Sequence, residues 1–160
     1  MTDTSLAHSI DPDTLAPDAA DPAVMNVMRD EVVFCLPSTP IDAVAKLLAD
    51  NRLTEIIVLL DRRPVGFVRQ EDIVERLVAG DVMIAGSDFA MRPTVTEVLA
   101  RDIIRTPPLL VDERQRLSEA VSVMTSQVRD LAIVMHEDET AVGMLTPTEI
   151  AAHASRLVRA

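Results

Sequence analysis

Ile56-Ile-Val-Leu-Leu60 and Val65-Gly-Phe-Val68 are two short apolar runs separated by the charged segment Asp61-Arg-Arg-Pro64. They follow a helical run, Ile41-Asp-Ala-Val-Ala-Lys-Leu-Leu48. Apolar runs of this length, bounded by turn-forming residues, are typical of buried strands. The segment therefore predicts a helix, two strands joined by a turn, and a further helix after the Val-Gly strand.

The same order recurs about 76 residues later in the chain. The second copy consists of Leu117-Ser-Glu-Ala-Val-Ser-Val-Met124, Leu131-Ala-Ile-Val-Met135 and Ala141-Val-Gly-Met-Leu145. A unit of this size has an apolar sheet face that it cannot cover alone, so two copies are expected to pack those faces together. The predicted fold class is α/β (α+β), and a functional site is expected in a cleft between the copies.

The composition excludes several classes of protein. The formal net charge of −11 and the aromatic content of 2% argue against nucleic-acid binding, because a polyanion would be repelled and stacking side chains are scarce. No run approaches the roughly 18 apolar residues that a membrane span requires, and the N-terminus lacks the regions of a signal peptide. The single cysteine, Cys35, is expected to be a small buried hydrophobe. These features predict a cytoplasmic protein.

The polar residues do not suggest catalysis or metal binding. The spacing of His8, His136 and His153 resembles no metal site. Four glycines leave no P-loop, and no nucleophile–base pair emerges. We therefore expect a protein that is not an enzyme and requires no cofactor.

The predicted organisation is a flexible tail (1–22), a first repeat (23–80), a connector (81–94) and a second repeat (95–158). Each repeat is expected to open on a short helix with apolar residues at helical spacing, namely Val24, Val27 and Met28, then Val95, Val98 and Leu99. A β-prone segment follows in each copy, Val32-Val-Phe34 and the region around Ile103-Ile104. Thr39 is expected to cap the helix that starts after Pro40, and Gly80 to end the helix that starts near Gln70.

The repeat, with its Val-Gly ending and an acidic residue six positions after the glycine, resembles the CBS domain. The resemblance covers roughly residues 23–157, and two such domains in tandem form a Bateman module. It implies two β-α-β-β-α repeats packed sheet to sheet about a pseudo-twofold axis. It also implies adenine nucleotides or S-adenosylmethionine as candidate ligands in the clefts, and regulation of an attached or partner protein.

In this family the ligand motif reads Gly-h-x-Thr/Ser-x-x-Asp/Asn, where h is apolar. The hydroxyl usually meets phosphate or backbone, and the acid usually meets ribose. The first copy, Gly66-Phe-Val-Arg69-Gln-Glu-Asp72, keeps the acid but has Arg69 in place of the hydroxyl residue. The second, Gly143-Met-Leu-Thr146-Pro-Thr-Glu149, keeps the hydroxyl but has the longer Glu149. The candidate binding residues are therefore Arg69, Asp72, Thr146 and Glu149.

Each of these residues also has a purely structural interpretation. Thr146 and Glu149 can form a capping box around Pro147. Arg69 is either a phosphate contact at a helix N-terminus or a solvent-exposed or ion-paired side chain, with Glu71 or Asp72 as its partner. Asp72 can accept from both ribose hydroxyls and also suits the first helical turn.

The leading hypothesis is a regulatory sensor for AMP, ADP, ATP or S-adenosylmethionine that signals to an unidentified partner protein. The site with Arg69 and Asp72 is expected to be the stronger one. The alternative is a scaffold or dimerisation module with degenerate sites that bind no nucleotide. A homodimer is expected in either case, with contacts around Val24–Met28, Val95–Leu99 and Ile150–Val158.

Overall fold

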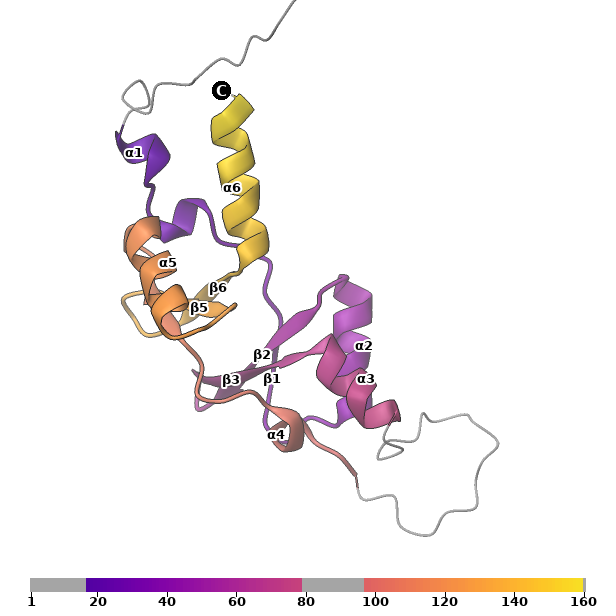
Figure 1. The fold of residues 1–160 in the computed structure, drawn as a ribbon. Helices are drawn as coiled ribbons and strands as arrows, with labels where there is room; N and C mark the ends of the chain where they lie inside the picture. Colours follow the sequence, from indigo (N-terminus) through magenta and orange to yellow (C-terminus); the bar gives the residue numbers. More distant parts are fainter. Residues whose placement is uncertain (1–16, 79–96, 160) are drawn as a thin grey trace, which may run out of the picture.

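The computed structural model describes residues 17–78 and 97–159 (Figure 1). The first repeat comprises β1 (Phe34–Cys35), α2 (Ile41–Asn51), β2 (Glu55–Leu60), β3 (Arg63–Arg69) and α3 (Gln70–Val78). The second comprises β4 (Leu110–Asp112), α5 (Leu117–Ser126), β5 (Ala132–Met135), β6 (Ala141–Leu145) and α6 (Pro147–Arg159). Short helices lie outside these units: α1 (Pro17–Ala20), η2 (Val24–Asn26) and α4 (Ala100–Ile103). The predicted β-α-β-β-α order is confirmed in both repeats.

Each repeat forms a three-stranded sheet, with orders β1-β2-β3 and β4-β5-β6. The first pair of strands in each sheet is parallel and the second is antiparallel. Ile56, Ile57 and Val58 are consecutive and fully buried. Successive side chains of a strand point to opposite faces, so the sheet is covered on both sides, as the unbroken apolar run predicts.

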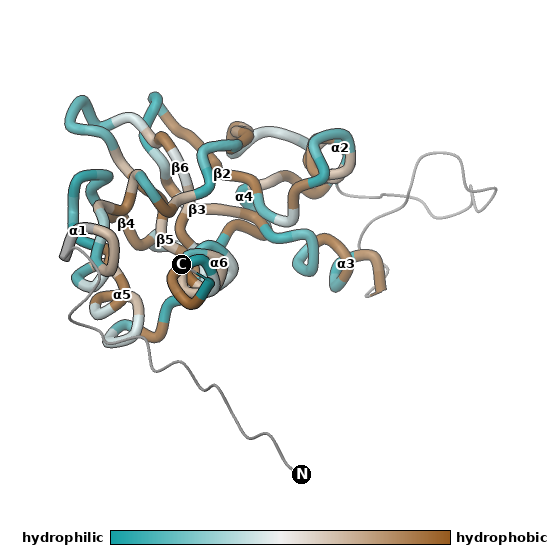
Figure 2. Tube along the Cα trace, turned by 90° about the horizontal axis from the view of Figure 1, so that it is seen from above, coloured by the Kyte–Doolittle hydropathy of each residue, from teal (hydrophilic) through white to brown (hydrophobic). Residues whose placement is uncertain are grey.

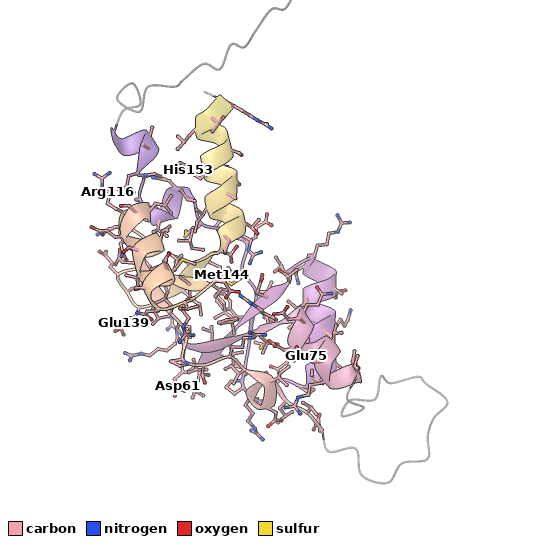
Figure 3. All side chains as sticks on the ribbon, in the orientation of Figure 1. Asp61, Glu75, Arg116, Glu139, Met144 and His153 are labelled. Atoms are coloured by element: carbon pink, nitrogen blue, oxygen red, sulfur yellow. The ribbon has the colours of Figure 1, made fainter. Side chains whose placement is uncertain are left out.

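The two sheets pack face to face. The cluster between them contains Ile57 and Phe67 from the first repeat and Leu131, Ile133 and Met144 from the second. Figure 2 shows the hydrophobic strands between the outer helices, and Figure 3 labels Met144 between the two halves. The sheet-to-sheet packing predicted for two homologous copies is confirmed.

The segment that precedes the first strand of each repeat, here called its lead-in segment, packs on the core of the other repeat. Val24 and Val27 are buried in the second-repeat cluster, whereas Ala100 and Ile103 are buried in the first-repeat cluster. Hydrogen bonds fix both exchanges: the Val24 N–H donates to Gln115 O at 2.9 Å, and the Ala100 N–H to Thr39 O at 2.8 Å. Neither repeat therefore covers its core with its own lead-in segment.

The backbone crossings reveal the pseudo-twofold relation. Arg29 forms an antiparallel bridge with Met144, and Arg105 forms the matching bridge with Phe67. The bridge between Ala23 and Arg116 is likewise matched by one between Pro40 and Leu99. Arg105 is therefore the structural counterpart of Arg29. Arg29 pairs with β6 of the second repeat, and Arg105 pairs with β3 of the first.

Three local predictions are wrong. Val98 and Leu99 do not lie in a lead-in helix, because α4 begins only at Ala100 and Leu99 is its extended N-cap residue. The strand of the second repeat is β4, not the region around Ile103-Ile104, because Ile103 ends α4 and turns into the first-repeat core. Thr39 does not cap α2: Pro40 is the N-cap residue, and the Thr39 hydroxyl accepts from the Leu36 N–H at 3.0 Å.

Part of the predicted tail is in contact with α5. The Asp21 carboxylate accepts from the Ser118 N–H at 2.8 Å and from the Ser118 hydroxyl at 2.7 Å. The tail boundary at residue 22 stays a prediction. His8, the Gly80 helix stop, the 81–94 connector and Val95 lie outside the described residues.

Cys35 is buried as predicted. Burial raises the pKa of its thiol to about 11, which leaves the thiolate scarce at neutral pH. Within the two described ranges, every helix is too short or too polar to cross a bilayer.

The side chain of His136, just after β5, meets the Glu113 carboxylate beyond the end of β4. Its hydrogen bond to Glu113 raises the pKa of His136 above the usual 6.5. A raised pKa in the folded state stabilises the fold below the unfolded-state pKa, and this stabilisation is lost as the pH rises through the folded-state value. The excess unfolding free energy of the wild type over His136→Gln should therefore be larger at pH 5.5 than at pH 8.5, measured by urea denaturation. An excess that is equal at both pH values would contradict this prediction.

Candidate functional site

A groove of about 630 Å³ lies between the repeats, where β3 leads into α3 and β6 leads into α6. The first repeat contributes Thr54, Glu55, Arg69, Gln70, Glu71, Val74 and Glu75, and the second contributes Asp130, Thr146, Pro147 and Thr148. Each repeat supplies the start of its closing helix. A molecule in the groove would thus touch both repeats at once.

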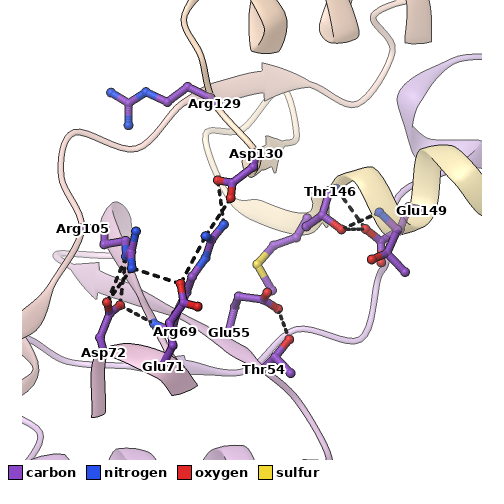
Figure 4. Close-up of polar contacts among 12 residues, drawn as sticks. Thr54, Glu55, Arg69, Glu71, Asp72, Arg105, Arg129, Asp130, Thr146 and Glu149 are labelled. Carbon is purple, nitrogen blue, oxygen red and sulfur yellow. Dashed lines mark hydrogen bonds and ion pairs between the residues drawn. The ribbon is translucent and has the colours of Figure 1, made fainter. Parts of the chain in front are cut away.

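Arg69, the last residue of β3, forms an ion pair across the groove. Its Nη2 lies 2.7 Å from Oδ1 of Asp130, and its Nη1 donates to Oδ2 at 2.8 Å (Figure 4). This hydrogen bond lowers the pKa of Asp130. Glu71 is a second, longer partner at 3.6 Å, and the guanidinium carbon lies 5.4 Å from the centre of the Phe67 ring. Arg69 is therefore ion-paired mainly with Asp130, which the prediction did not name, and with Glu71, whereas Asp72 accepts from its backbone N–H.

One donor of Arg69 remains unused in the part of the chain that is described. Its Nε is buried and has no hydrogen-bond partner there. The side chain as a whole is 15% exposed. Arg69 is therefore held in place by Asp130 and Phe67 while it still faces the groove.

The Asp72 carboxylate accepts hydrogen bonds from two residues, Arg69 of its own repeat and Arg105 of the segment that crosses β3. Its Oδ2 accepts from the Arg69 N–H at 3.0 Å, and this hydrogen bond caps the start of α3. Nη2 of Arg105 lies 2.7 Å from its Oδ1, and Nε lies 3.0 Å from its Oδ2. The side chain of Asp72 is 12% exposed, and Asp72 is not among the residues that line the groove.

Thr146 and Glu149 form the predicted capping box at the start of α6. The Thr146 N–H donates to Glu149 Oε2 at 2.9 Å, and the Thr148 N–H to the Thr146 hydroxyl oxygen at 3.3 Å. The Thr146 hydroxyl also donates to the Glu149 carboxylate. Thr146 lines the groove, whereas Glu149 is turned back onto the helix end.

The two halves of the site differ in how their crossing arginine is paired. Arg105 binds Asp72, but Arg29 binds Glu55 at 2.9 Å instead of the corresponding Glu149. Glu55 is the first residue of β2, and Leu131 stands at the equivalent place in the other repeat. The carboxylate of Glu55 thus draws Arg29 to the first repeat.

The structure therefore brings two of the four predicted site residues together. Arg69 and Thr146 line one groove from opposite repeats, and Asp72 and Glu149 support them from behind. The prediction missed Thr54, Glu55 and Asp130. Thr54 and Asp130 are 76 positions apart, just before β2 and β5, so alignment of the two copies contains a signal for this pair.

Among the described residues, no group of three His, Cys, Asp or Glu side chains could hold a metal ion. The chemistry of the groove is that of hydrogen bonding and charge. It offers hydroxyl groups, carboxylates and one guanidinium to a small polar molecule.

Comparison with known proteins identifies the fold. The family model described as the CBS domain matches residues 24–79 and again residues 100–156. The uncharacterized protein MK0525 of Methanopyrus kandleri is 24% identical over 130 residues, which are 80% of this chain. The chain spans 60% of the length of that relative.

Two solved structures with bound adenosyl molecules have a similar fold. The CBS domain pair of protein MJ0100, in complex with 5′-methylthioadenosine and S-adenosyl-L-methionine, has a TM-score of 0.67 at 13% identity, covering 86% of this chain and 98% of that one. CBSX2 in complex with AMP has a TM-score of 0.62 at 20% identity, covering 86% and 98%; the protein comes from Arabidopsis thaliana. At these identities the likeness concerns the fold.

Proposed function

This chain belongs to the CBS domain family, with two copies in tandem, and we propose that it is a regulatory module that binds an adenine-containing metabolite between its repeats. The observation that carries the proposal is the groove of about 630 Å³ lined by both closing-helix junctions. That volume lies within the range of typical small-molecule sites. The adenosyl ligands of two CBS pairs with the same fold support the choice of ligand class.

A ligand in this groove can change the relation between the repeats. Arg69 and Asp130 come from different repeats and are held together by their own ion pair. A ligand that contacts both residues would bind best to the arrangement of the repeats that keeps them close, and would shift the population toward it. We propose that a partner protein reads this shift, and that the chain itself performs no catalysis.

The roles of the four predicted residues differ within this proposal. Arg69 and Thr146 are the direct contacts, because both line the groove. Glu149 is a positioning residue that holds the Thr146 hydroxyl. Asp72 positions the Arg69 backbone, and it becomes a ribose acceptor only when Arg105 moves away.

A calorimetric titration tests this function with AMP, ADP, ATP and S-adenosylmethionine. A bulky side chain at the exposed residue Thr54, in Thr54→Trp, should fill the groove and weaken binding at least about tenfold, or about 1.4 kcal/mol. Thr125→Trp, at an exposed position on α5, is the matched control and should bind like the wild type.

The alternative function is a scaffold that takes no nucleotide, and the capping contacts of Thr146 and Glu149 are compatible with it. No heat with any of the four ligands at millimolar concentration would establish the scaffold over the sensor. Binding that Thr54→Trp leaves unchanged would place the ligand outside this groove.

We also propose a homodimer in the cytoplasm. One predicted contact surface needs correction: Val24 and Val27 are 0% and 6% exposed within the chain, so they cannot meet a second copy. Helix α6 has no buried residue, and Val158 is 73% exposed. Native mass spectrometry of the purified protein would report the oligomeric state and any retained ligand together.

A further inference from the structure

Resting on this proposed function, we infer that the groove selects adenosyl ligands that are uncharged or positively charged and discriminates against nucleoside polyphosphates. The inference comes from the charges that line the groove and from the state of its cationic groups. Among the adenine-containing candidates, this selectivity favours nucleosides that carry no phosphate chain.

Carboxylates outnumber cations in the lining. Among the described residues that line the groove, Glu55, Glu71, Glu75 and Asp130 carry carboxylates, and Arg69 carries the guanidinium. The side chains of Glu71 and Asp130 are 60% and 64% exposed, so their charge faces the solvent-filled space. A polyphosphate would enter against this charge, and against the net charge of −11 of the whole chain.

Three nearby arginines are already paired with carboxylates. Arg69 is bound to Asp130, Arg105 to Asp72 and Glu71, and Arg29 to Glu55. A phosphate group could take the Nη1 and Nη2 donors of Arg69 only by displacing Asp130. The released carboxylate would then lie beside the incoming anion, because both would compete for the same guanidinium.

Several backbone donors at the starts of α3 and α6 are also occupied. A helix N-terminus attracts anions through free N–H groups. Here the Arg69 and Thr146 N–H groups donate to Asp72 and Glu149, and the Gln70 N–H donates to Thr54 O at 2.8 Å. Pro147 has no N–H to offer. At the Arg69 and Thr146 N–H groups, the chain's own carboxylates thus stand where a phosphate would bind.

The same features suit a cationic ligand. An ammonium or sulfonium group placed near Glu71 and Asp130 would be attracted by both carboxylates without breaking the pair that Arg69 makes. Val74 and Pro147 supply apolar surface in the same groove. S-adenosylmethionine combines a nucleoside with both kinds of positive group and one carboxylate, so its net charge is positive, whereas 5′-methylthioadenosine is an uncharged nucleoside.

Titrations with S-adenosylmethionine, 5′-methylthioadenosine, AMP and ATP, each with and without Mg²⁺, test this selectivity. We expect S-adenosylmethionine to bind at least about tenfold more tightly than ATP, a difference of about 1.4 kcal/mol. Equal or tighter binding of ATP would overturn the inference while leaving the sensor function supported. Failure of every ligand to bind would overturn the proposed function and this inference with it.

The variant Asp130→Asn tests whether the Asp130 charge and its ion pair with Arg69 cause the selectivity. It frees Arg69 and removes one negative charge, so the preference for S-adenosylmethionine over ATP should fall at least about fivefold. Asp138→Asn removes the same charge in the β5–β6 turn, at the other end of the strands from the groove, and should leave the preference unchanged. A preference that both variants change equally would assign the selectivity to net charge and not to the groove.

Discussion

Replacing Gly66 by alanine is expected to destabilise the protein by about 3 kcal/mol, as overpacking of a tightly fitted interior does. A Cβ at this position would collide with the carbonyl oxygen of Arg105 and would lie 2.6 Å from Cγ1 of Ile104. The crossing segment cannot retreat easily, because the Arg105 N–H donates to Phe67 O at 2.8 Å. Unfolding in urea, followed by circular dichroism, measures the loss.

The corresponding glycine of the second repeat provides the matched control. A Cβ at Gly143 would lie 2.6 Å from Sδ of Met28 and 2.8 Å from the carbonyl oxygen of Arg29. The methionine side chain is flexible and can move aside, and the backbone carbonyl is less close than at Gly66, so Gly143→Ala should cost less than Gly66→Ala. Equal costs, or a Gly66→Ala variant within about 0.5 kcal/mol of the wild type, would show that the close backbone approach does not limit this position.

The loss at Gly66 should extend to the site. The carbonyl oxygen that the new methyl group would displace belongs to Arg105, whose guanidinium holds Asp72. Asp72 in turn accepts from the Arg69 N–H. We therefore expect Gly66→Ala to weaken ligand binding in the groove as well as stability, although Gly66 does not line it.

The elements that sequence predicts well are those whose signal is local. The buried run Ile56-Ile-Val58 has the length and composition of a strand covered on both faces, and its second copy identifies the partner sheet. β4 carries a weaker signal, because Val111 is its buried residue and both neighbours are exposed. The β-branched pair Ile103-Ile104 is more strand-like by composition, but packing on the first-repeat core overrides that preference.

The candidate site divides in the same way. Arg69 and Thr146 follow from a motif position within each copy, so they could be predicted without a structure. Asp130 could not, because its ion pair with Arg69 joins residues 61 positions apart across the repeat interface. The pairing of Asp72 with Arg105 depends equally on the crossing of the second lead-in over β3.

The packing of each lead-in segment on the other repeat predicts a second large effect on stability. Val24 is 0% exposed and belongs to the core of the second repeat. Val24→Asp would bury an unpaired carboxylate among apolar side chains and should cost about 4 kcal/mol or more. If that variant does not fold, Val24→Ala should still lose about 2 kcal/mol, because it removes the burial of two methyl groups.

Met25→Asp is the matched control. The side chain of Met25, the next residue, is 46% exposed, so this position should tolerate the charge. The decisive measurement is amide hydrogen exchange of Val24→Ala. The exchange of segments predicts that protection falls first in β5 and β6 of the second repeat, although residue 24 opens the first. Protection lost first in β2 and β3, or equal costs for Val24→Asp and Met25→Asp, would contradict the exchange. Since each repeat depends on the other's lead-in for its core, we expect binding between the repeats and folding of either one to be coupled.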